Sequence, residues 1–157
     1  MLREEFEKIG KVILKEIKKY YKDRLISVVI FGSLARGCPS YDSDIDLLIV
    51  AEKLPRGRMK RVREFEKVEN KIDWYLRQLE KKGIYTYLSP IIKTKEEVEL
   101  GSPLFLDMVE NSIILFDRND FFKNKILDLK KRLEKSGAKR IEKESYWYWV
   151  LNPDMEL

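Results

Sequence analysis

The stretch that most constrains the fold runs from Phe31 to Val50 and reads FGSLARGCPSYDSDIDLLIV. An apolar run ends at Gly32-Ser33, a turn-rich segment follows, and a second apolar run begins with Asp44 and Asp46. Both runs have the length and the branched side chains of buried β-strands. The sequence therefore predicts two buried strands whose polar ends, a Gly-Ser pair and two carboxylates, are the best candidates for chemistry.

The two aspartates lie two residues apart, and because side chains alternate across a strand, Asp44 and Asp46 share one face. Apolar side chains take the opposite face. Bare carboxylates are very costly to bury, so this end of the strand is expected at an open edge or beside cations. Two carboxylates this close destabilise each other unless a cation lies between them. Hard oxygen ligands suit Mg²⁺ or Mn²⁺, so the pair predicts a platform for a metal–triphosphate complex.

The Gly-Ser pair supplies candidate phosphate ligands. Gly32 allows a tight turn and a close approach between backbone and ligand. Ser33 offers a hydroxyl at the start of a helical turn, where free N–H groups attract phosphate, and Arg36 can reach the same anion. With the aspartates, these residues indicate in-line phosphoryl or nucleotidyl transfer. The alternative interpretation is that the aspartates merely begin a strand at the surface and that Gly-Ser is an ordinary turn.

The chain of 157 residues contains no histidine and a single cysteine. Serine–histidine and cysteine–histidine nucleophile pairs and zinc sites with histidine ligands are therefore excluded, and any acid–base or metal chemistry must use carboxylates. The cysteine count, with no signal peptide or membrane span in the sequence, predicts a cytoplasmic protein. Lys and Arg total 32 against 27 Asp and Glu, so the net charge is +5, which suits an anionic partner such as a nucleotide or RNA.

Periodicity along the rest of the chain predicts alternating helices and strands. Helices are expected at 2–22, 56–82, from 94, at 103–110 and at 119–136, and strands at 25–31, 44–50, 84–92 and 112–116, with a final strand or hairpin. Pro90 marks an edge or an irregularity in the third strand, and Asn119 or Asp120 is expected to cap the last helix. The order predicts an α+β fold, with one small mixed β-sheet and helices mainly on one face. We expect a single domain, 1–157, with 117–157 as a C-terminal extension of helix plus strand.

The segments FGSLARG and DSDIDLLIV resemble the signature of the DNA polymerase β-like nucleotidyltransferase superfamily, above all its small stand-alone prokaryotic members of the minimal (MNT) type. The resemblance implies a polymerase β palm-like fold in which Gly32 and Ser33 hold the triphosphate. Asp44 and Asp46 would bind two Mg²⁺ or Mn²⁺ ions. The implied reaction moves a nucleoside monophosphate from an NTP, with ATP the expected donor, to a hydroxyl of a protein or RNA acceptor. Some minimal members are antitoxins that adenylylate a helical HEPN-type toxin, so a cognate toxin is a candidate partner.

The sequence departs from the family pattern at one place. Family enzymes usually carry a third carboxylate on the next core strand, which helps to bind the catalytic metal and to activate the attacking hydroxyl. The strand predicted at 84–92 contains none, and Ser89 is the small polar residue near its middle. Four carboxylates elsewhere are candidate stand-ins: Asp42, Asp73, Glu96 and Glu97. This departure motivates a second hypothesis, a nucleotide-binding or partner-binding module without turnover, such as an antitoxin that acts by contact.

Two surface features suggest further partners. A basic run at 56–63 is either a solvated helix face or a surface that steers nucleic acid or a triphosphate. The aromatic run 146–149 has the composition of a stacking platform, although packing or a partner interface is the favoured interpretation. RNA binding through both features is the third hypothesis, and no membrane partner is expected.

Overall fold

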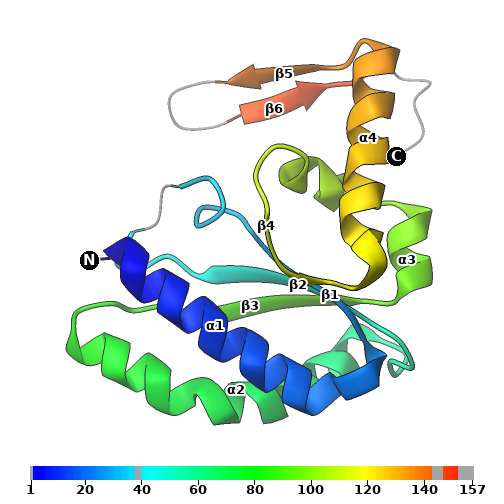
Figure 1. Cartoon of the computed structure of the whole chain (residues 1–157). Helices are drawn as coiled ribbons and strands as arrows, with labels where there is room; N and C mark the ends of the chain where they lie inside the picture. The colour runs from blue at the N-terminus through cyan, green and yellow to red at the C-terminus, as the bar shows by residue number, and fades with distance from the viewer. Residues whose placement is uncertain (1, 38–39, 143–146, 152–157) are drawn as a thin grey trace.

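Strands β1 and β2, which lie next to the Gly-Ser and Asp-x-Asp segments, form the centre of a four-stranded sheet (Figure 1). A computed structural model of the protein describes residues 2–37, 40–142 and 147–151. The elements are, in chain order, α1 (Leu2–Tyr21), η1 (Lys22–Arg24), β1 (Leu25–Phe31), β2 (Ile45–Ala51), α2 (Arg58–Lys81), β3 (Leu88–Lys93), α3 (Lys95–Leu100), η2 (Pro103–Met108), β4 (Ile113–Asp117), η3 (Arg118–Asp120), α4 (Phe121–Ser136), β5 (Lys139–Glu142) and β6 (Trp147–Val150).

The four-stranded sheet has the order β3-β2-β1-β4 and is mixed, which confirms the prediction. Strand β1 is antiparallel to both β2 and β4, whereas β3 is parallel to β2. Because β3 lies at the edge, Pro90 is tolerated there although it has no N–H to donate.

The strand predicted over 84–92 begins only at Leu88. Residues 84–87 lie beside the loop before β2 instead, where the buried Thr86 hydroxyl donates to the Ser43 carbonyl at 2.6 Å. The segment is therefore bonded to a loop and not to a β-strand. Its buried and exposed residues alternate as they would in a strand, which is why the sequence predicted one here.

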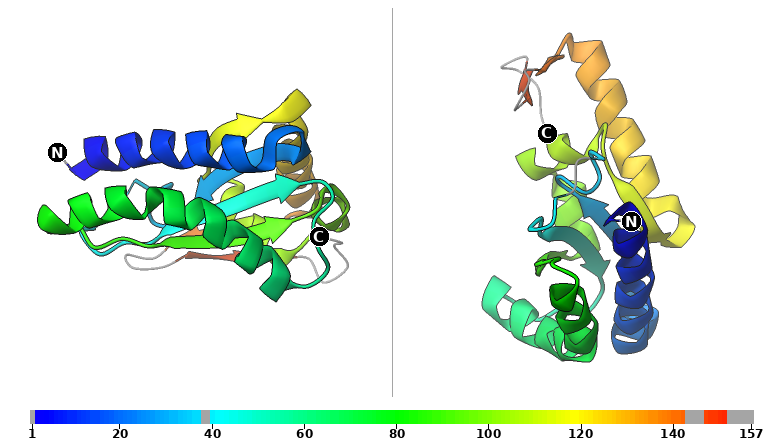
Figure 2. Two further views of the ribbon diagram at one scale, coloured as in Figure 1. Left: turned by 90° about the horizontal axis from the view of Figure 1, so that it is seen from below. Right: turned by 90° about the vertical axis from the view of Figure 1, so that its left-hand side faces the viewer.

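Helices cover both faces of the sheet (Figure 2). The two longest, α1 and α2, lie side by side on one face, in line with the prediction of helices mainly on one face. A second layer of α3, η2 and α4 covers the other face. As predicted, β2 alternates between them: Ile45, Leu47 and Ile49 join the first core, and Leu48 and Val50 join the second.

The side chain that caps the first turn of α4 belongs to Asp117, although the N-cap position itself is held by Asp120, in agreement with the prediction of Asn119 or Asp120. Both of those residues have positive φ angles, 54° and 55°, and the Asp120 side chain makes no capping hydrogen bond. Asp117 Oδ1 accepts from the Phe122 N–H and Oδ2 accepts from the Lys123 N–H, each at 2.9 Å. The tight η3 turn therefore brings the end of β4, rather than the turn itself, to the helix N-terminus.

Strands β5 and β6 form a separate antiparallel pair, which confirms the predicted final strand or hairpin. Trp149 packs against the second core, and its indole N–H donates to the Leu106 carbonyl at 3.4 Å, which supports the packing interpretation for this ring. Tyr146 lies outside the described residues. Within the described ranges, no helix is both long and apolar enough to cross a bilayer. The organisation as one domain with 117–157 as an extension stays a prediction.

We expect Asp117→Ala to lower the free energy of unfolding by about 2–4 kcal/mol, because it removes a helix cap and a hydrogen-bond partner of a buried hydroxyl. That hydroxyl belongs to Ser27 in β1 and donates to Asp117 Oδ1 at 2.6 Å. Asp120→Ala, which removes no capping bond, should cost less than about 1 kcal/mol. Urea unfolding of both variants measures the difference, and equal losses would contradict the assignment of the cap.

Candidate nucleotidyl-transfer site

The Gly-Ser pair and the two aspartates meet where β1 ends and β2 begins. Antiparallel pairing sets Asp46 opposite Phe31, the residue before Gly32. Asp46 is the second residue of β2 and is half-buried, whereas Asp44 precedes the strand by one residue and is exposed. The pairing of two strands thus brings both halves of the predicted site together.

Gly32 is required at its position by both space and backbone conformation. Its φ angle is +75°, in the region that residues with a side chain rarely adopt. A Cβ atom on this residue would overlap a carboxylate oxygen of Asp46. The bare backbone at the end of β1 therefore lies directly against the Asp46 carboxylate, and the two predicted half-sites form one surface.

Residues 32–37 form the short turn that the sequence predicts after the Gly-Ser pair. The Arg36 N–H donates to the Gly32 carbonyl at 3.1 Å, which closes one helical turn that begins at the glycine. Ser33 is partly exposed in this turn. The Arg36 guanidinium contributes a positive charge that acts on Asp46. The predicted contact of Arg36 with a phosphate stays a prediction.

The electrostatics of the site centre on Asp46. Burial raises the pKa of the Asp46 carboxyl, the nearby Asp44 carboxylate raises it further, and the Arg36 guanidinium opposes both effects. A smaller upward contribution to the pKa of Asp46 comes from Asp107. The site therefore carries more negative charge than its single arginine balances, which is the condition that a bound cation would relieve.

Asp107, in η2, is a site residue that sequence reasoning missed. Partial burial raises the pKa of its carboxyl, and Arg36 lowers it, so the same arginine faces both Asp46 and Asp107. The neighbours Phe105 and Met108 belong to the second core, which fixes η2 on the face that carries Asp46. A charged residue inside the otherwise apolar PLFLDM was the one signal in the sequence, and it does not indicate which strand end the helix covers.

Ser89, the small polar residue of the strand expected to carry the family's third carboxylate, pairs with Asp46 across the parallel ladder. Two of the candidate stand-ins serve local structure instead. Asp73 pairs with Arg77 at 2.9 Å on an exposed helix face. Glu97 completes a capping box with Thr94 at the start of α3.

The remaining stand-ins, Asp42 and Glu96, are exposed in the loop before β2 and in the first turn of α3. In the part of the chain that the structure describes, no three acidic or thiol side chains lie close enough to hold a metal ion together. The arrangement therefore offers two aspartates, with Asp107 within electrostatic range as a third charge.

The donor set of this pair fits a hard divalent cation. Two carboxylates two residues apart, one exposed and one half-buried against a bare backbone, leave room for water and phosphate oxygens to complete a shell. Mg²⁺ in particular keeps several waters and takes few protein ligands. Asp44 and Asp46 are the residues that could hold such an ion.

Three exposed tyrosines, Tyr41, Tyr85 and Tyr87, belong to segments next to the start of β2 and were not singled out from the sequence. The Tyr85 N–H donates to the Tyr41 carbonyl at 2.6 Å, and the Ile45 N–H donates to the Tyr87 carbonyl at 2.8 Å. These bonds hold the tyrosine segments beside the start of β2. Exposed aromatic rings at such a place can stack on a nucleotide base.

The basic run at 56–63 divides into two parts. Arg61 is mostly buried and structural: it donates to the Pro55 carbonyl at 2.8 Å and to Glu97 Oε1 at 2.6 Å. Arg58 and the other cations of the run are exposed. The run is therefore not one continuous surface for nucleic acid.

Comparison with known proteins agrees with this geometry. The model of the nucleotidyltransferase domain family matches residues 11–133. A relative in Methanocaldococcus jannaschii, MJ1305, which is named as a candidate protein adenylyltransferase, is 32% identical over 139 residues. That match covers 85% of this chain and 87% of the relative. A second candidate protein adenylyltransferase of the same organism is 39% identical over 56 residues, which are 36% of this chain and 57% of that protein.

Solved structures share the fold at low sequence identity. A toxin–antitoxin structure with AMP-PNP superposes with a TM-score of 0.50 at 15% identity, covering 82% of this chain and 92% of that one. The spectinomycin adenyltransferase AAD(9) from Enterococcus faecialis gives 0.51 at 12% identity, covering 83% and 66%. The predicted α+β nucleotidyltransferase fold is therefore confirmed. Since the family model covers most of its length, the chain belongs to the nucleotidyltransferase domain family, and its reaction class is nucleotidyl transfer.

Proposed function

We propose that the protein transfers AMP from ATP to a hydroxyl group of a protein acceptor, at the site formed by Gly32, Ser33, Asp44 and Asp46. The observation that carries this proposal is the contact of the Gly32 backbone with the Asp46 carboxylate, which joins a phosphate-binding turn to an acidic pair. The name of the relative MJ1305 supports a protein acceptor and an adenylyl group. The AMP-PNP in the toxin–antitoxin neighbour supports ATP, and makes a cognate toxin one candidate acceptor.

The chemistry follows from the charges. The acceptor oxygen attacks the α-phosphorus, the bond from that phosphorus to the bridging oxygen breaks, and pyrophosphate leaves while the hydroxyl proton passes to a carboxylate or water. Gly32 and Ser33 bind the leaving phosphates, and Arg36 balances their charge. The family uses divalent cations; Mg²⁺ or Mn²⁺, held by Asp44 and Asp46, would neutralise the phosphates and favour the ionised acceptor hydroxyl.

A second candidate function is a partner-binding module without turnover, acting by contact as an antitoxin. It is favoured by one observation, the serine at position 89 opposite Asp46. Labelled ATP, a divalent cation and candidate protein acceptors separate the two functions. Reproducible transfer of label that requires the aspartates would exclude the module without turnover.

The double variant Asp44→Ala/Asp46→Ala should weaken metal-dependent ATP binding on the order of 100-fold and abolish label transfer, because the charges that hold the cation are gone. Isothermal titration in the presence of Mg²⁺ measures the first effect. The matched control is Asp73→Ala/Asp128→Ala, which makes the same change in charge at exposed helix positions. Unchanged ATP binding in a folded Asp44→Ala/Asp46→Ala protein would refute the site.

Gly32→Ala should weaken ATP binding by at least about tenfold, because the added methyl group must displace the Asp46 carboxylate and the φ of +75° disfavours alanine. Gly37→Ala is the matched control: its φ is +76°, but among the described residues, its chain neighbours aside, no atom lies within 4 Å of the added carbon. Comparing the two by titration separates backbone strain from the contact with Asp46. Equal losses would show that the contact has no part in binding.

We propose Asp107 as the carboxylate that replaces the missing third acidic group in turnover. Asp107→Asn should lower label transfer by about 100-fold or more while changing the ATP dissociation constant less than about threefold. The control is Glu110→Gln, an exposed carboxylate two residues beyond η2. Transfer at the wild-type rate in Asp107→Asn would leave the charge of Asp107 without a catalytic role.

A further inference from the structure

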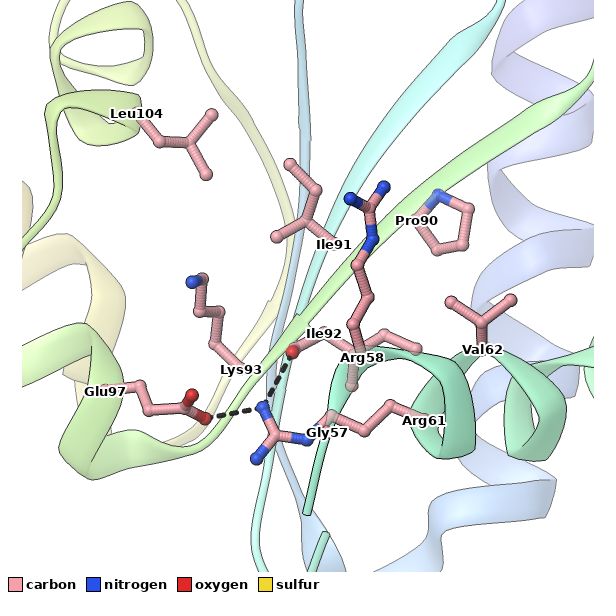
Figure 3. A pocket seen from close by; sticks show the side chains of 10 residues that line it. All are labelled: Gly57, Arg58, Arg61, Val62, Pro90, Ile91, Ile92, Lys93, Glu97 and Leu104. Atoms are coloured by element: carbon pink, nitrogen blue, oxygen red, sulfur yellow. Dashed lines mark hydrogen bonds and ion pairs between the residues drawn. The ribbon is translucent and has the colours of Figure 1, made fainter. Parts of the chain in front are cut away.

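A pocket of about 360 Å³ lies along the edge of β3, away from the Gly-Ser turn (Figure 3). It is bounded by the first turn of α2, by β3, and by single residues of α3 and η2. Its volume is within the range of small-ligand sites. Its polar lining is cationic apart from Glu97, and its apolar lining includes Ile91 and Leu104.

The cations of the pocket differ in their freedom to bind a ligand. Arg61 is committed to the Pro55 and Ile92 carbonyls and to Glu97, with the last contact at 2.6 Å. The side chains of Arg58 and Lys93 form no hydrogen bond or ion pair with any residue that the structure describes. Figure 3 shows the Arg58 guanidinium between Ile91 and Pro90, and the Lys93 ammonium on the other side of Ile91, between Glu97 and Leu104. Two cations beside an apolar wall are therefore available to an anionic ligand.

The pocket continues the surface that holds the aspartates. Ser89 pairs with Asp46, and alternation along β3 places Ile91 and Lys93 on the same face as Ser89. At the rise of a strand, Ile91 lies about 7 Å and Lys93 about 13 Å beyond Ser89. A segment that presents a group at Asp46 therefore reaches both pocket residues within a few residues of extended chain.

The geometry of the proposed transfer places the acceptor on the β3 side of Asp46, an inference that rests on the proposed function. In an in-line displacement, the attacking oxygen and the leaving oxygen lie on opposite sides of the phosphorus. Gly32 and Ser33, at the β1 side of Asp46, take the leaving phosphates. The acceptor hydroxyl must then approach over β3, the strand on the other side of β2.

The edge of β3 does not favour a guest strand held by its backbone. Pro90 has no N–H, and the Ile92 carbonyl already accepts from Arg61 at 3.2 Å. The pocket lining contains no aromatic ring on which a base could stack. Recognition must therefore come from the two cations and the apolar wall, which suits acidic side chains of a protein better than a nucleic acid.

We propose that this pocket binds the protein acceptor through carboxylates two to four residues from the modified hydroxyl, with Arg58 and Lys93 as the specificity-determining cations. A fluorescent peptide with a central tyrosine and glutamates at those positions on both sides is the probe, and the same peptide with glutamines is its control. Fluorescence anisotropy with AMP-PNP and Mg²⁺ should give the glutamate peptide on the order of tenfold higher affinity. Arg58→Gln/Lys93→Gln should remove that preference.

The matched control is Lys11→Gln/Lys71→Gln, which removes the same charge from exposed helix positions and should keep the preference. Arg58→Glu/Lys93→Glu should reverse it in favour of a peptide with lysines at the same positions. Equal affinity for the glutamate and glutamine peptides in the wild-type protein would overturn the proposal. So would a single-stranded oligouridylate that binds more tightly than the glutamate peptide and depends on Arg58 and Lys93.

AMP-PNP titration separates this inference from the proposed function. Arg58→Gln/Lys93→Gln should retain the wild-type affinity for AMP-PNP, since neither residue lies at the Gly-Ser turn. If this variant loses the preference for the glutamate peptide but still binds AMP-PNP, the result confirms that the pocket binds the acceptor. Nucleotide binding that survives Asp44→Ala/Asp46→Ala refutes the proposed function itself, and the assignment of the acceptor side falls with it.

Discussion

The site depends on one close contact, that of the Gly32 backbone with the Asp46 carboxylate. The contact exists because β1 and β2 pair with Phe31 opposite Asp46, which leaves no space for a side chain on the next residue. The register of the two central strands and the identity of position 32 are thus coupled. A shift of one residue would turn Asp46 toward the core under α1 and α2, where a carboxylate is very costly.

The same contact explains why the site needs positive charge. Half-burial against the backbone raises the pKa of Asp46, and Asp44 raises it further. When a carboxyl has a higher pKa in the folded protein than in the unfolded chain, the folded protein loses stability as the pH rises from the lower pKa to the higher one. At neutral pH the ionised Asp46 therefore opposes folding. Arg36 offsets part of this charge, and a cation at the aspartates would offset more. Stability is therefore given up at the place where phosphate and metal chemistry is proposed.

The sequence was informative where local chemistry decides the structure. Strand β1 was predicted within its observed bounds, and the alternation along β2 was correct because each face of that strand is buried in its own core. Prediction failed where partners come from distant parts of the chain. Asp117 caps α4 because the η3 turn brings it there, and Asp107 reaches the site because η2 packs over the sheet. No local sequence pattern predicts that Asp117 reaches α4 or that Asp107 reaches the site.

The strand beside the aspartates, β3, carries an uncharged serine where it lies opposite Asp46. With Ser89 opposite Asp46, the acidic charge near the transfer site comes from η2 above the sheet instead of from the strand beside it. The edge of β3 is then free of negative charge from Ser89 to Lys93, and Arg61 neutralises the one carboxylate nearby, Glu97. An acidic acceptor would be repelled by an aspartate at position 89 but is attracted by Arg58 and Lys93. An uncharged residue at position 89 therefore fits both of our proposals, a third acidic charge supplied by Asp107 and an edge of β3 that accepts an acidic partner.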